Sequence, residues 1–63
     1  MAMNELIAVL EKEKDWIGMN DLIQKTGLKY FTVAVQGMKL HKRNLVSKQY
    51  IGTKVYYKIK NGN

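Results

Sequence analysis

The stretch LKYFTVAVQGMKLHKRNLV, residues 28–46, determines which fold this chain adopts. Its first half is aromatic and β-branched, which favours a strand. As a strand, however, this half would have no polar face. As a helix over about residues 29–42, the same stretch places Val33, Gly37 and Leu40 on one side, and Asn44 follows where a left-handed residue would end it. Some 14 residues without a turn signal therefore predict a helix.

The residues before this stretch predict two helices and one short strand between them. An amphipathic first helix is indicated by apolar residues at helical spacing, namely Met3, Leu6, Ile7 and Leu10. Asn4 would cap this helix. Residues 16–19 are a short apolar break, which predicts a small strand. Asn20, as a cap, and Asp21 then start a short second helix, and Gly27 can end it in the left-handed conformation.

The residues after the stretch predict a β-hairpin. Residues 45–51 and 55–60 alternate in the manner of strands, and Gly52-Thr53-Lys54 forms a short loop between them. In the second strand, Val55, Tyr57 and Ile59 would face inward, while Tyr56, Lys58 and Lys60 would face outward.

The length of 63 residues predicts one domain, residues 1–63, with a small core. Without cysteine and with a single histidine, the chain offers no disulfide, no thiolate zinc site and no multi-histidine metal site. A small core favours association, so we expect a homodimer. We expect no membrane span, no signal peptide, a cytoplasmic location and no room for a ligand pocket.

Charge is unevenly distributed along the chain. All five acidic residues precede Leu22, whereas the remaining residues carry nine lysines or arginines and no acid. A segregated basic half is typical of proteins that bind polyanions. The alternative interpretation is an ordinary solvated, lysine-rich surface.

The predicted order is helix, short strand, short helix, tight turn, helix and hairpin. Over residues 17–59 the chain resembles the winged helix-turn-helix domains of small bacterial and phage transcriptional regulators. The resemblance rests on Thr26-Gly27-Leu28, Thr32-Val33, Leu40, Leu45-Val46 and Tyr57-Lys58-Ile59, at the family's spacing. Asn44 stands where the family has glycine, and Gly37 replaces an aliphatic residue. Gly37 should weaken or kink the helix, or let another element approach closely.

The resemblance implies an α+β fold, with a three-helix core and a C-terminal β-hairpin wing. It also implies that the helix at residues 29–43 enters the major groove of double-stranded DNA, and that the hairpin at residues 45–60 reaches adjacent backbone or minor groove. The DNA-binding residues would be Lys25, Lys29, Tyr30, Thr32, Gln36, Lys39, Lys42, Arg43, Lys48, Thr53 and Lys54.

These residues would have different roles. The polar stripe of the helix comprises Thr32, Gln36, Lys39 and Arg43. Gln36 would pair with an adenine edge, and Lys39 with guanine or phosphate. Four basic residues would contact phosphate: Lys25, Lys29, Lys42 and Arg43. The tip of the hairpin would carry Lys48, Thr53 and Lys54.

Several residues allow two interpretations. Phe31, Val35 and Met38 form an apolar face that could touch thymine methyl groups or bind another protein. Tyr30 could contact DNA or be a half-buried core residue. Trp16 and Tyr57 are expected to anchor the core or a dimer interface.

The sequence predicts a non-enzymatic regulator or accessory factor that binds duplex DNA, with no metal or cofactor and a nucleoid-associated location. The alternative is a winged-helix adaptor that binds a protein through Phe31, Val35 and Met38. In a third interpretation, Tyr50, Tyr56 and Tyr57 form a stacking platform for single strands.

Overall fold

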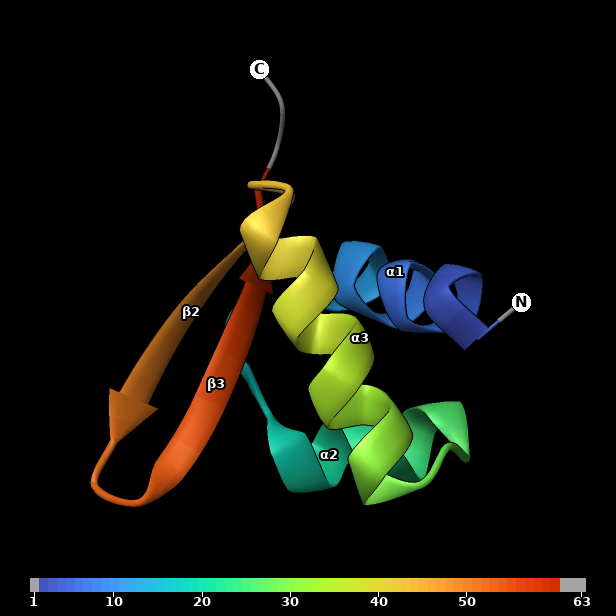
Figure 1. Cartoon of the computed structure of the whole chain (residues 1–63), viewed down its shortest axis with the longest axis horizontal. Helices are drawn as coiled ribbons and strands as arrows, with labels where there is room; N and C mark the ends of the chain where they lie inside the picture. Colours follow the sequence, from blue (N-terminus) through green and yellow to red (C-terminus); the bar gives the residue numbers. More distant parts are fainter. Residues whose placement is uncertain (1, 61–63) are drawn as a thin grey trace.

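Three helices and a three-stranded antiparallel sheet make up the structure, a computed structural model that describes residues 2–60, with side chains from Glu5 onward. The elements are α1 (Ala2–Glu13), β1 (Ile17–Gly18), α2 (Met19–Thr26), α3 (Tyr30–Lys42), β2 (Val46–Ile51) and β3 (Lys54–Ile59). Figure 1 shows the β2–β3 hairpin beside α3, with its turn at the end of the molecule where α2 lies and α3 begins. The predicted α+β class, a three-helix core with a β-hairpin wing, is confirmed.

The ambiguous stretch is a helix, as predicted. Lys29 is its extended N-terminal flanking residue, and the expected inward residues Val33, Gly37 and Leu40 are all buried. Tertiary burial of this one face therefore overrides the strand propensity of the first half.

Asn44 ends α3 in the left-handed conformation, with φ of 66°. The Leu45 N–H donates to the Leu40 carbonyl at 3.0 Å, and the Asn44 N–H donates to the His41 carbonyl at 3.0 Å. This pair of bonds is the Schellman motif, which satisfies carbonyls that the helix leaves unpaired. The predicted end of the helix is thus confirmed.

The first two helices begin earlier than predicted. Since α1 begins at Ala2, Asn4 lies inside the helix and does not cap it, and the Met3 side chain is outside the described residues. The cap of α2 is Gly18, not Asn20, because Gly18 pairs with Tyr56 of β3 and the chain turns into the helix directly after this strand. Gly27 ends α2 with φ of 73°, as predicted.

The sheet has the order β1-β3-β2, so β3 is the central strand. Ile17 of β1 pairs with Tyr57, and Val46 of β2 pairs with Ile59. The turn between β2 and β3 comprises only Gly52 and Thr53, so Lys54 belongs to the strand and not to the loop. Tyr57 is buried, with Val55 and Ile59 packed against the core, which confirms the predicted inner face.

The core receives side chains from every element, and its buried members are Leu6, Leu10, Ile17, Met19, Leu22, Val33, Leu40, Val46 and Tyr57. Tyr57 can pack in this core because Gly37 has no side chain. A Cβ atom at Gly37 would lie 2.7 Å from Cζ of the Tyr57 ring, which is closer than atoms can pack. The expected close approach of another element is therefore confirmed, and that element is β3.

Trp16 lies outside this core, with 38% of its surface exposed, so its interpretation as a core residue is wrong. It precedes β1, and the Lys58 ammonium lies 6.0 Å from its ring centroid. Along the described residues, no helix has the length and apolar character that crossing a bilayer requires.

Candidate nucleic-acid interface

The outermost surface of α3 is a ridge of four residues, Phe31, Val35, Met38 and Lys42, which we call the α3 ridge. Their spacing of four, three and four positions puts them on one side of the helix, opposite the buried line of Val33, Gly37 and Leu40. Phe31 is 75% exposed and Met38 55% exposed, while Val35 is partly buried. The apolar face noted in the sequence therefore points outward and shares its surface with Lys42.

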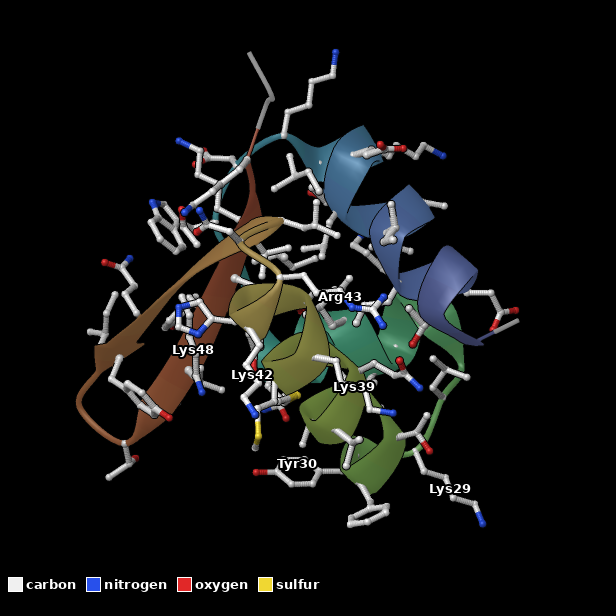
Figure 2. All side chains as sticks on the ribbon, turned by 45° about the horizontal axis from the view of Figure 1, so that its top comes forward. Lys29, Tyr30, Lys39, Lys42, Arg43 and Lys48 are labelled. Carbon is white, nitrogen blue, oxygen red and sulfur yellow. The ribbon has the colours of Figure 1, made fainter. Side chains whose placement is uncertain are left out.

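The predicted polar stripe divides between two environments. Lys39 and Arg43 are exposed, whereas Thr32 and Gln36 are partly buried beside the inward-facing line. The Gln36 Oε1 atom is buried and has no hydrogen-bond partner among the described residues. In the view of Figure 2, Lys39 and Lys42 extend to different sides of α3, Lys42 from the ridge itself and Lys39 from beside it.

Tyr30 is 63% exposed at the start of α3, so its interpretation as a half-buried core residue is wrong. It lines a recess of about 320 Å³ between the start of α2, the start of α3 and the hairpin turn. Asn20, Asp21, Thr53 and Lys54 also line this recess. Contrary to the expectation that the chain has no room for a pocket, the starts of α2 and α3 and the hairpin turn leave this open recess between them.

Lys48 lies in the middle of β2 and not near the tip of the hairpin, since its register partner is Tyr57. Residues two apart in a strand share a face, so Lys48 lies on the same face as the buried Val46. Its Nζ atom is 5.2 Å from the ring centroid of Tyr50 and 6.0 Å from that of Tyr57. The alternation from Val46 onward is the signal in the sequence that could have located it.

Lys48 and three tyrosines form a cluster between α3 and the hairpin, which we call the tyrosine cluster: Tyr30, Lys48, Tyr50 and Tyr57. A hydrogen bond with Tyr50 raises the pKa of Lys48, against the opposing effect of burial. Burial raises the pKa of the Tyr57 phenol, the Lys48 charge lowers it, and Tyr50 and Tyr30 raise it further. The cluster links the start of α3 to the middle of the hairpin.

The tyrosines of the hairpin do not form one stacking surface. Tyr57 is buried, Tyr50 is 66% exposed, and Tyr56 points to the opposite face of the sheet from Tyr57. The third interpretation, in which these three residues form one stacking platform, does not fit this arrangement, because strand alternation separates its members.

The remaining predicted contacts lie at the edges of this surface. Lys29, Thr53 and Lys54 are exposed, and Thr53 and Lys54 line the recess. Lys25, at the end of α2, forms an ion pair with Glu13 of α1, with 3.3 Å between Nζ and Oε2. Lys25 therefore offers less free positive charge than an unpaired lysine.

The surface of α3 and the hairpin is basic because the described residues from Leu22 onward include no acid. Acidic side chains lie on α1, at Asp15 and at the start of α2, where Asp21 borders the recess. Among the described residues, no three histidine, cysteine, aspartate or glutamate side chains gather in a way that could hold a metal ion.

Comparison with protein-family models, with curated proteins and with solved structures gave no significant match to this chain.

Proposed function

We propose that this protein binds double-stranded DNA without catalysing a reaction, as a small winged helix-turn-helix regulator or accessory factor. The observation that carries the proposal is the exposed face of α3 with Lys39 and Lys42, on a helix that has no acidic side chain. An α-helix has the width to enter the major groove, and lysines at its sides reach the phosphates.

The other elements would complete the contact. With α3 in the groove, the hairpin turn at Thr53 and Lys54 reaches adjacent backbone or minor groove. Lys29, at the start of α3, would contact phosphate, and Tyr30 beside it would contact a base or phosphate. This activity places the protein on the nucleoid in the cytoplasm.

A salt titration tests the proposal. Each lysine that neutralises a phosphate releases a counterion, so the logarithm of affinity for a mixed-sequence duplex should fall linearly with the logarithm of salt concentration. Lys42→Ala should weaken binding and reduce the slope by about one. Lys12→Ala, in the last turn of α1, is the matched control and should leave the slope unchanged. Absence of duplex binding at about 50 mM salt would refute the proposal.

A second candidate function rests on the exposure of Phe31 and Met38. A protein adaptor would use these side chains, with Val35, to dock on a partner protein and modulate it. Apolar anchors make the main contribution in such interfaces. In that case a duplex would not bind, while Phe31→Ala would abolish binding of the partner.

A further inference from the structure

The α3 ridge combines exposed apolar side chains with one cation, Lys42, and a second cation, Lys39, lies beside it. Phe31 and Met38 leave 75% and 55% of their surfaces exposed. No acidic side chain lies on α3. This charge pattern complements a polyanion that also presents apolar groups between its charges, and it is less suited to the neutral or basic groove of a protein.

Duplex DNA presents one apolar group along its major-groove edges, the C5 methyl group of thymine. Adenine, guanine and cytosine offer only donors and acceptors there, which the side chains of Phe31 and Met38 cannot pair with. Phe31 and Met38 can therefore gain binding free energy by burying a thymine methyl group, and the other bases offer no such group in the major groove.

We infer that Phe31 and Met38 read thymine methyl groups in the major groove, which makes the protein selective for sites that contain thymine. This inference rests on the proposed function. The two residues are seven positions apart, which corresponds to about 10 Å along the helix axis. Base pairs rise about 3.4 Å each, so the two methyl groups should belong to different base pairs of the site.

Exchange of thymine for uracil in the duplex tests the inference, because uracil keeps every hydrogen-bonding group and lacks only the methyl. Duplexes recovered by selection from a random pool are resynthesised with deoxyuridine and titrated with the full chain. Burial of one methyl group contributes about 0.8 kcal/mol, so each lost contact should weaken binding about fourfold.

Alanine variants test whether the thymine preference arises from the α3 ridge. Phe31→Ala and Met38→Ala should each remove the thymine preference at one position, so that thymine and uracil at that position bind the variant equally well. Both side chains are exposed, so neither change disturbs the core. The matched control is Ile51→Ala, another exposed apolar residue, which lies at the hairpin and should leave the thymine-to-uracil ratio unchanged.

The outcomes separate this inference from the proposed function. Equal binding of the thymine and uracil duplexes would overturn the inference and leave DNA binding intact. An unchanged ratio in Phe31→Ala and Met38→Ala would also overturn it, because the preference would then arise elsewhere. Failure to bind any duplex would overturn both.

Discussion

At Gly37 the absence of a side chain is what allows α3 and β3 to approach each other. The ring of Tyr57 occupies the space that a Cβ atom would need, at 2.7 Å from Cζ and 2.8 Å from the hydroxyl oxygen. A glycine inside a helix ordinarily weakens it by about 1 kcal/mol relative to alanine. Here the burial of an aromatic ring offsets that loss.

We predict that Gly37→Ala destabilises the protein by about 1–2 kcal/mol, since overpacking of a core outweighs the gain in helix propensity. Urea denaturation measures the change. The control is the double variant with Tyr57→Leu, which removes the ring and should lose less stability than the sum of the single variants. A Gly37→Ala variant as stable as the parent would show that Tyr57 can move aside.

Stability should decrease at alkaline pH because of the tyrosine cluster. Burial raises the pKa of Tyr57 above its ordinary value of 10.0, so the unfolded chain loses this proton more readily than the folded one. The raised pKa of Lys48 likewise makes the folded state less stable as the pH rises. The contribution is complete below about pH 10 and is lost as the pH rises through the folded-state values.

Tyr57→Phe should therefore lose less stability than the parent chain between about pH 9 and pH 11, as measured by urea denaturation at each pH. The matched control is Tyr56→Phe, on the opposite face of the sheet, which should keep the dependence of the parent. If Tyr57→Phe shows the same fall in stability as the parent, the titration of Tyr57 does not contribute.

At the scale of elements, the stability of α3 depends on the left-handed residue that ends it, Asn44. Asn44 holds φ at 66°, a conformation that costs most L-residues about 1–2 kcal/mol and glycine nothing. Its Oδ1 atom also accepts a hydrogen bond from Lys60 Nζ at 2.6 Å, on the exposed surface. The residue thus joins the end of α3 to the residue that follows β3.

We predict that Asn44→Ala destabilises the protein by about 1 kcal/mol, whereas Asn44→Gly keeps or slightly raises its stability. Thermal unfolding of the two variants distinguishes the backbone effect from the Lys60 hydrogen bond, since both variants lose the bond and only Asn44→Ala strains the backbone. Equal losses in both would assign the effect to the hydrogen bond.

The whole molecule has a small core and several exposed aromatic side chains. Trp16 is 38% exposed and Tyr50 66% exposed, although aromatic residues gain most from burial. A second copy of the chain that covers Trp16 would supplement the core, as is common for domains of this size.

We predict a dimer, with a sedimentation mass about twice 7.3 kDa at micromolar concentration. Trp16→Ala should shift the mass toward the monomer, because it removes the expected anchor. Phe31→Ala is the control and should leave the mass unchanged, since we assign that side chain to DNA. A parent chain that sediments as a monomer would contradict the prediction.

The candidate site could be predicted from the sequence only in part. The basic character of α3 and the hairpin follows from the lack of acid after Asp21, and the inward line of α3 follows from helical periodicity. The face on which Lys48 lies could have been predicted from the strand alternation that begins at Val46. The partial burial of Gln36 could not be predicted, because it depends on which neighbouring element covers that side of α3.

The sequence by itself determined the order of the elements, the helical nature of residues 30–42 and the ends of α2 and α3. These features follow from local rules, namely apolar periodicity and the left-handed tolerance of Gly27 and Asn44. Only the tertiary structure decided that Tyr57 packs on Gly37, that Trp16 stays outside the core and that Gln36 is partly buried. The reason is that burial is a property of contacts between distant segments, and spacing along a single helix or strand does not specify them.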